Sequence, residues 1–172
     1  MRPSLNGSTV IYRVKDLTKT VIIERATVTD AEEILALQKL AYISEAEIYD
    51  DFTIPPLVQT LEEIRGDFEK QVLLKAIVNG RIIGSVRALS EKETCYIGRL
   101  IVHPDSQNQG IGTTLMTEIE NIFRPSNRFE LFTGHKSEKN LHLYQKLGYK
   151  IFKTEKVNDK LNLVYLEKTT KN

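Results

Sequence analysis

The segment from Gly98 to Thr113 constrains the fold of this chain more than any other stretch of its sequence. Residues Gly98 to Val102 form a mostly apolar run that predicts a strand, and Pro104 would stop that strand. The loop Gln107-Asn108-Gln109-Gly110-Ile111-Gly112-Thr113 follows and leads into apolar residues at helical spacing, which predict a helix from about Gly110 to Phe123. The segment therefore predicts a strand, a glycine-containing loop and a helix start in direct succession.

This arrangement favours an anion site at the start of the helix. Glycine allows a close approach of the backbone and unusual φ values. The first turn of a helix leaves N–H groups without partners, and the helix dipole adds roughly half a positive charge there, so a phosphate fits. The loop lacks the Lys-Ser/Thr ending of a nucleoside-triphosphatase P-loop and the third glycine of a dinucleotide-binding fingerprint. For a Gly-x-Gly pair alone, a tight turn that only permits packing is the alternative interpretation.

The rest of the chain predicts one α/β (α+β) domain, with a mixed, mostly antiparallel sheet and helices on both faces. The Asn79-Gly80 pair is a strong hairpin signal between two of the strands. The predicted order is β-α-α-β-β-β-α-β-α-β-β: strand 21–26, a helix from 29 to about 42, helix 57–68, strands 72–78, 81–89 and 94–102, helix 110–123, strand 129–133, helix 137–147, and strands 149–157 and 161–167.

Residues 1–20 are polar and broken by Pro3 and Gly7, and they predict a loose N-terminal extension in which 9–14 could form an extra strand. The domain itself is expected over 21–168. Thr29, with Glu32 three residues later, predicts a capping box for the first helix. Residues 50–56 hold two aspartates and a Pro-Pro pair and predict a loop.

Composition excludes several classes of protein. The net charge of +1 gives no support for a nucleic-acid footprint, and the single cysteine, Cys95, excludes an internal disulfide. The three histidines and Cys95 have no metal-ligand spacing, so we expect no metal. We expect no membrane span, because no apolar run approaches about 20 residues. The first residues lack the apolar core of a signal peptide, and we expect a cytoplasmic location.

Two motifs together resemble those of the GNAT acetyltransferases. Their main motif is Gln or Arg, two residues, Gly, one residue, then Gly or Ala, and Gln107, Gly110 and Gly112 match it. Val102-His103-Pro104 also matches the valine-x-proline that usually precedes that loop. Near the C-terminus, the stretch Asn140-Leu141-His142-Leu143-Tyr144-Gln145-Lys146-Leu147-Gly148-Tyr149 resembles the family's Leu-Tyr-x-x-Leu-Gly-Phe/Tyr helix. The resemblance covers roughly residues 21–168.

The resemblance implies acetyl-coenzyme A as the cofactor. It implies that the two central parallel strands, ending at Val102 and Thr133, splay apart to admit the thioester. Asn140 matches a position that often binds the cofactor, whereas Ser137 stands where many members carry another asparagine. The pantetheine arm would pair with the backbone of Leu100, Ile101 and Val102, and the pyrophosphate would bind the amides of Gln107, Asn108, Gln109, Gly110, Ile111, Gly112 and Thr113.

Transfer of an acetyl group to an amine needs a group that removes a proton, since an amine with a pKa near 10.4 is protonated at pH 7. It also needs a proton for the departing thiolate, and Tyr144 matches the family's proton-donating tyrosine. The alternative for Tyr144 is a packed aromatic side chain, which is also our prediction for Tyr149. Many relatives carry an acidic residue on the strand before the loop, but residues 96–100 hold no carboxylate, so the base is not assigned.

The acceptor-binding loop of the family lies between the first two helices. Here that segment holds Tyr42, Glu45 and Tyr49, which we predict to bind the acceptor, a primary amine of a small molecule or of a protein or peptide. The acidic residues Glu45, Glu47, Asp50 and Asp51 would favour a cationic small molecule or relay its proton, although such a cluster is also typical of a solvated face.

Several further expectations complete the sequence-based interpretation. His103, His135 and His142 are predicted at the surface, and Cys95 is predicted to be a small packed residue. The edge of the C-terminal strand pair could pair with a second copy in a homodimer. Because the strand carboxylate is missing, an acyl-coenzyme A sensor without turnover is the alternative function.

Overall fold

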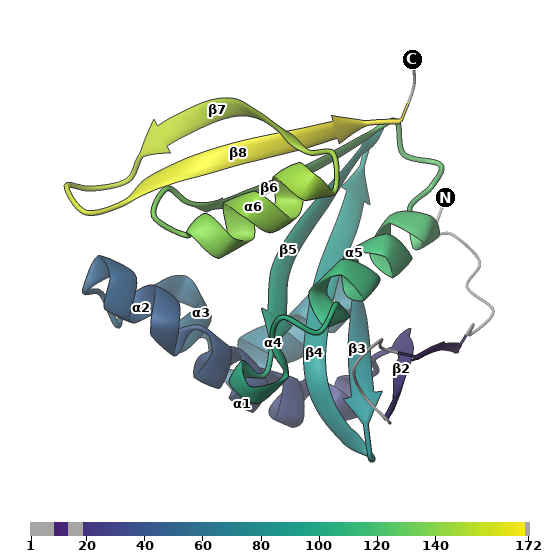
Figure 1. Ribbon diagram of the computed structural model, residues 1–172. Helices are drawn as coiled ribbons and strands as arrows, with labels where there is room; N and C mark the ends of the chain where they lie inside the picture. Colours follow the sequence, from purple (N-terminus) through teal and green to yellow (C-terminus); the bar gives the residue numbers. More distant parts are fainter. Residues whose placement is uncertain (1–8, 14–18, 171–172) are drawn as a thin grey trace.

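The computed structural model describes residues 9–13 and 19–170 (Figure 1). Its eight strands form one sheet in the order β1-β2-β3-β4-β5-β6-β8-β7, and every neighbouring pair is antiparallel except β5 and β6. The strands are β1 Val10–Arg13, β2 Thr20–Arg25, β3 Val72–Val78, β4 Arg81–Glu91, β5 Thr94–Val102, β6 Arg128–Gly134, β7 Lys150–Lys156 and β8 Asn162–Thr169. The helices are α1 Ala31–Ala41, α2 Ile43–Tyr49, α3 Pro55–Val58, α4 Leu61–Lys70, α5 Ile111–Ile122 and α6 Glu138–Lys146, with short 3₁₀ turns at Val28–Asp30 and Pro104–Ser106.

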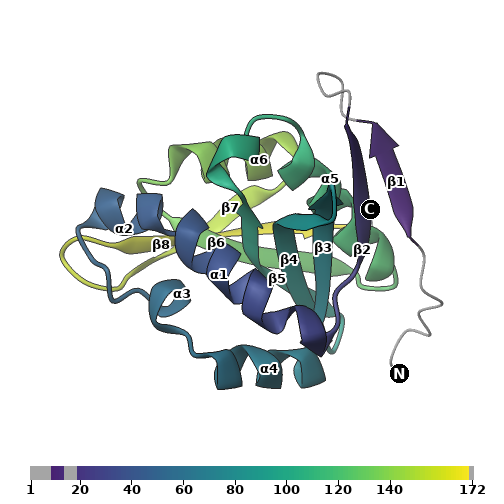
Figure 2. The ribbon, with the colours of Figure 1, turned by 90° about the horizontal axis from the view of Figure 1, so that it is seen from below.

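Two hydrophobic clusters hold the helices on the two faces of the sheet. Helices α1 and α4 cover one face, while α5 and α6 lie on the other (Figure 2). On the α5 face, Leu115, Met116 and Ile119 are fully buried at helical spacing against the central strands. On the opposite face, Ile34 of α1 and Ile64 of α4 are buried against the sheet. The predicted mixed sheet with helices on both faces is confirmed.

The parallel strands β5 and β6 diverge from one another (Figure 1). Their pairing covers only Thr94 to Tyr96 on β5 and Arg128 to Glu130 on β6. Beyond Tyr96, β5 pairs only with β4, and β6 continues beside β8 to Gly134. The predicted splay between the ends of these two strands is therefore present.

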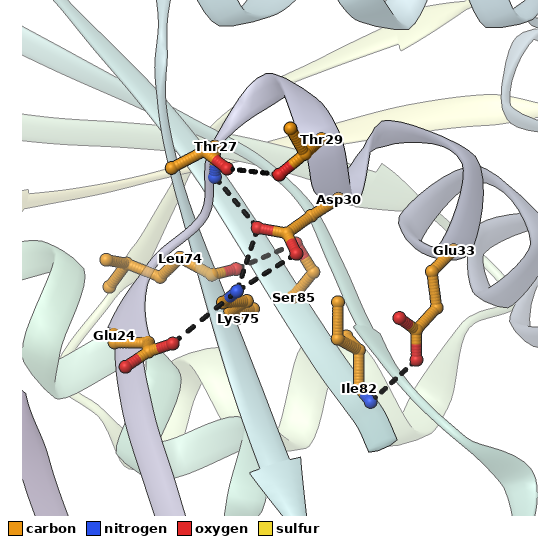
Figure 3. Close-up of polar contacts among 9 residues, drawn as sticks. All are labelled: Glu24, Thr27, Thr29, Asp30, Glu33, Leu74, Lys75, Ile82 and Ser85. Atoms are coloured by element: carbon orange, nitrogen blue, oxygen red, sulfur yellow. Dashed lines mark hydrogen bonds and ion pairs between the residues drawn. The ribbon is translucent and has the colours of Figure 1, made fainter. Parts of the chain in front are cut away.

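The first helix begins differently from the prediction. The cap is Thr27, whose backbone N–H donates to Asp30 Oδ2 over 2.8 Å, and a 3₁₀ turn precedes α1 (Figure 3). The predicted box of Thr29 and Glu32 is wrong, because the Asp30 carboxylate also accepts a hydrogen bond over 2.8 Å from Lys75 Nζ on β3. That ion pair fixes Asp30 at the turn, and the helix starts after it.

The segment between α1 and β3 holds more helix than the sequence predicted. A further helix, α2, follows Tyr42 directly. The expected loop at 50–56 is wrong at its end, because Pro55 and Pro56 open α3, where missing N–H groups cost nothing. The predicted helix 57–68 is split, since Thr60 and Glu63 form a capping box that starts α4 at Leu61.

At the N-terminus, the strand anticipated within 9–14 is found as β1, paired with β2. The other residues of the expected extension, 1–8 and 14–18, lie outside the described part of the chain. Among the described residues, no helix is both long and apolar enough to cross a membrane.

Candidate functional site

A groove of about 750 Å³ opens where β5 and β6 diverge. The structure brings most of the predicted site residues to its walls, whereas Gln109, Tyr49 and Tyr144 are not among the residues that line it. The predicted residues that line the groove are Leu100, Ile101, Val102, Gln107, Asn108, Gly110, Ile111, Gly112, Thr113 and Asn140 of the cofactor set, and Tyr42 and Glu45 of the acceptor set.

The loop before α5 is shaped so that backbone amides reach the groove. Gln107 folds back, and its Nε2 donates to the Val102 carbonyl over 3.3 Å. Asn108 (φ 60°) and Gly110 (φ 82°) are both left-handed, and no side chain caps the start of α5 at Gly110. The first N–H groups of α5 therefore have no intrahelical partner and no side-chain cap, which leaves them available to an anion.

The second glycine of the loop leaves a cradle on the groove wall. A Cβ built on Gly112 would meet the side chains of Leu143 at 3.6 Å, Leu100 at 3.8 Å and Val102 at 3.9 Å, all of which line the groove. Because Gly112 has no side chain, the space beside the unpaired amides is left free for a ligand. Amide donors next to an open cradle fit a diphosphate group.

The backbone of β5 supplies a free strand edge in the same groove. Its ladder to β4 continues through Ser85–Ile101 and Gly84–Val102, but its other side has no ladder to β6 beyond Tyr96. Leu100, Ile101 and Val102 line the groove along that side. An extended ligand with amide groups can pair there as an added strand would.

Basic residues on the α6 side of the groove were missed by sequence reasoning. Lys136, Lys139, His142 and Lys146 all line it. The last three recur at helical i, i+3 and i+7 positions, so their spacing could have revealed one basic helix face. The three lysines complement the negative charge of a phosphate-bearing ligand.

A buried hydrogen-bond network ties α2 to the junction of β6 and α6. The Tyr49 hydroxyl accepts from the Lys136 backbone N–H over 2.8 Å and lies 3.2 Å from Ser137 Oγ. Ser137 Oγ in turn donates to the Glu45 carboxylate. Tyr49 is 4% exposed, so the structure places it behind the groove, where it holds Glu45 and Ser137 in position.

Gly134 permits this network, which leads to a prediction for Gly134→Ala. A Cβ there would stand 2.1 Å from the Tyr49 hydroxyl oxygen, so Tyr49 has to move and lose its hydrogen bonds. We expect about 2 kcal/mol of destabilisation, and thermal unfolding should show a Tm lower by about 4 to 8 °C. Gly98→Ala is the control, since a Cβ at that strand position meets nothing within 4 Å. Equal Tm values for the two variants would show that Tyr49 does not depend on Gly134.

Tyr144 lies in the core behind the groove, next to Leu143 of the groove wall. It is 7% exposed, and its ring meets the Tyr149 ring edge-on at a centroid distance of 6.1 Å. Burial raises the pKa of the Tyr144 phenol, and the nearby groups Tyr42 and Glu45 raise that pKa further. The phenol is therefore protonated at neutral pH. Tyr149, 2% exposed, is a core residue as predicted, and its hydroxyl donates to Glu120 Oε1 over 2.8 Å.

The remaining candidates have structural positions. His142 is exposed and His103 is partly exposed, whereas His135 is half-buried and accepts from the Asn162 backbone N–H over 3.0 Å through Nδ1. All three histidines thus keep some exposure, as expected for surface positions. Cys95 is fully buried, as predicted. On β5, the position next to Leu100 holds Arg99, a residue that sequence reasoning did not single out.

Comparison with known proteins agrees with this geometry. The model of the Acetyltransferase (GNAT) family matches residues 32–149 of the chain. The UPF0157 protein YqkA of Bacillus subtilis (strain 168) is 31% identical over 128 residues, which cover 74% of this chain. The chain spans only 37% of the length of that relative.

Solved structures show the same fold. The GNAT domain of S. lividans PAT has a TM-score of 0.74 at 20% identity, over 94% of this chain and 96% of that one. The PaiA N-acetyltransferase from Thermoplasma acidophilum, solved in complex with coenzyme A, has a TM-score of 0.71 at 16% identity, over 87% of this chain and 98% of that one. The splayed strands and the glycine loop agree with what the resemblance of the two motifs implied. Because the family model matches most of the length of this chain, the chain belongs to the GNAT family of acetyltransferases.

Proposed function

We propose that this protein is an acetyl-coenzyme A-dependent N-acetyltransferase that acts on a primary amine. The observation that carries the proposal is the groove between β5 and β6, in which a free strand edge leads to the uncapped first turn of α5. That combination matches the two polar parts of coenzyme A, an amide-bearing arm and a diphosphate. The solved relative that contains coenzyme A supports the same ligand class.

The cofactor supplies a thioester whose carbon–sulfur bond breaks as the acetyl group passes to the amine nitrogen. The residues of the groove wall would orient it: the backbone of Leu100 to Val102 along the arm, and the amides from Gln107 to Thr113 at the diphosphate, with Asn140 beside them. Lys139 and Lys146 would add positive charge next to the phosphates.

Proton transfer would use Glu45 of the groove wall and Tyr144 behind it. An ammonium acceptor must lose two protons, one before its nitrogen attacks and one after it, and the departing sulfur gains one. The Tyr144 phenol, kept protonated by burial, would donate to the sulfur. Glu45 lines the groove and is held by Ser137, so its carboxylate would attract the ammonium form of the acceptor and accept its proton directly or through water. Tyr42 would form the adjacent wall of the acceptor pocket.

The deciding experiment follows release of free thiol from acetyl-coenzyme A in the presence of a panel of primary amines. Acetylation of at least one amine, with mass spectrometry of the product, supports the transferase. If the protein binds acetyl-coenzyme A but releases no thiol with any amine, it acts as a sensor. If it binds no coenzyme A, the proposal fails altogether.

The thiol of the buried cysteine should not react in this assay, and this absence of reaction is itself a prediction. Cys95 is 0% exposed, and burial raises the pKa of its thiol to about 12. Only the thiolate reacts with thiol reagents, so native protein should give no signal with DTNB over the time of an assay. In guanidinium chloride it should give one thiol per chain. Fast reaction of native protein would contradict the buried position.

A further inference from the structure

A β-bulge on β5 directs Arg99 out of the regular pattern of its strand. Ser85 of β4 pairs with Ile101 and Arg87 pairs with Gly98, so Arg99 and Leu100 together face one residue of β4. Arg99 has a left-handed backbone, with φ 50°. Bulges of this kind re-aim a side chain, and a non-glycine residue in this conformation is held there by its surroundings.

The bulge brings the Arg99 guanidinium to Tyr42, at the wall of the groove. Its Cζ atom lies 5.9 Å from the centroid of the Tyr42 ring. Tyr42 and Glu45 line the groove, as does Leu100, the next residue along β5. Arg99 itself is not among the residues that line the groove, so its guanidinium stands behind the Tyr42 ring, on the acceptor side rather than beside the amides of α5.

A second guanidinium lies behind the first. Arg87 is 7% exposed and its Nη1 is 2.6 Å from Asp67 Oδ2. Gln59 also donates to Asp67 Oδ2, over 2.7 Å, so this carboxylate is fully engaged. Burial lowers the pKa of Arg87, and the charge of Arg99 lowers it further, which shows that the two cations are close. Asp67 thus pairs with Arg87, and no ion pair among the described residues joins it to Arg99.

Arg99 has an unmet donor at this point. Its Nε atom is buried and has no hydrogen-bond partner among the described residues. No carboxylate of the described residues forms an ion pair with Arg99 either. A buried charged donor without a partner is costly, and the planar fork of arginine matches a carboxylate in two parallel hydrogen bonds.

We propose that the acceptor is a small amine that also carries a carboxylate, which Arg99 binds with Arg87 behind it while Glu45 faces the amine. This inference rests on the proposed transferase function and names the substrate class of the same site. Glu45 and Arg99 thus offer opposite charges on the acceptor side, beside Tyr42, which fits an amino acid. A polyamine, which the acidic segment alone would favour, places a second cation against Arg99.

The test compares matched acceptors in the thiol-release assay. Each free amino acid is paired with the amine that lacks its carboxylate, such as lysine with cadaverine or phenylalanine with phenethylamine. For the best amino acid, the wild-type kcat/KM should exceed that of its partner by about 100-fold, because the unpaired arginine penalises the amine without a carboxylate. The same amino acid placed within a peptide should be a poor acceptor.

Substitution of Arg99 assigns the preference to this side chain. In Arg99→Gln, the ratio between the matched acceptors should fall about 10- to 100-fold, mainly through KM of the amino acid. Because the unpaired guanidinium no longer penalises it, the plain amine should gain kcat/KM in this variant, and the Kd of coenzyme A should stay within about twofold. Arg99→Lys, which keeps the charge but loses the fork, should give an intermediate ratio. Arg124→Gln, which removes an exposed arginine elsewhere, is the control and should leave the ratio unchanged.

The outcomes separate the two proposals. Equal kcat/KM for both members of every pair in the wild-type protein overturns the acceptor class and leaves the transferase intact, whatever the variants do. A preference that survives in both Arg99 variants also overturns it. Absence of turnover with every amine overturns the transferase function, and the acceptor class with it.

Discussion

Replacing Gly112 with aspartate should abolish cofactor binding while the domain still folds. The new Cβ would have only ordinary contacts of 3.6 Å and beyond, so the side chain fits, and it enters the groove. A carboxylate in the first turn of α5 is favourable for the helix itself. It would, however, occupy the amides that the diphosphate needs, and it would repel that group. Two unit charges about 4 Å apart repel by roughly 4 kcal/mol near a protein surface, which salt screening reduces.

We therefore expect the Kd of coenzyme A to rise at least about 100-fold, measured by isothermal titration calorimetry. Gly66→Asp is the matched control, because it adds the same charge to helix α4, where a Cβ at Gly66 meets nothing within 4 Å. It should bind coenzyme A like the wild type, and Tm values confirm that both variants are folded. Affinity retained within threefold in Gly112→Asp would show that the diphosphate binds elsewhere.

The parts of the site that could be predicted are those that short stretches of sequence encode. The turn from β5 through the glycine loop into α5 depends on neighbouring residues, such as Pro104 and Gly110, and the structure confirms it. The divergence of β5 and β6 was implied by the family resemblance and is likewise present. Local chemistry sets both the loop and the helix start, so a single sequence suffices to find them.

The parts that could not be predicted depend on contacts between distant segments. Thr27 and Thr29 are each followed three residues later by an acidic residue, so either could form a capping box. The ion pair between Asp30 and Lys75 of β3 favours the box of Thr27 (Figure 3). The position of Arg99 against Tyr42 requires a bulge that is defined only by the register of β5 against β4. Regular alternation of side chains along the strand, without the bulge, would have predicted a different orientation for Arg99.

The same limit applies to Tyr49. Its aromatic character and its place between the first helices predicted contact with the acceptor. Only the approach of Gly134, on a strand far along the chain, shows that its hydroxyl is committed to Lys136 and Ser137. A residue of the predicted acceptor segment can thus act indirectly, through the position of a neighbour such as Glu45.

Replacing Tyr144 with phenylalanine should lower kcat about 100-fold or more, the usual contribution of a general acid, with the Kd of coenzyme A unchanged within twofold. The hydroxyl of Tyr144 forms no hydrogen bond with any described residue, so its loss should cost little stability, and it is free for the proposed role toward the ligand. The measurements are steady-state thiol release, calorimetric binding and thermal unfolding.

Tyr149→Phe provides the matched control, because the two rings touch in the same buried cluster. Its hydroxyl donates to Glu120, which also pairs with Lys168 over 2.7 Å, so its removal should cost about 1 kcal/mol of stability and leave kcat within twofold. The two variants thus have opposite signatures: one loses turnover and keeps stability, whereas the other loses stability and keeps turnover. If Tyr144→Phe retains full kcat, the proton that reaches the departing sulfur comes from water or from the acceptor, and Tyr144 is a packed aromatic residue.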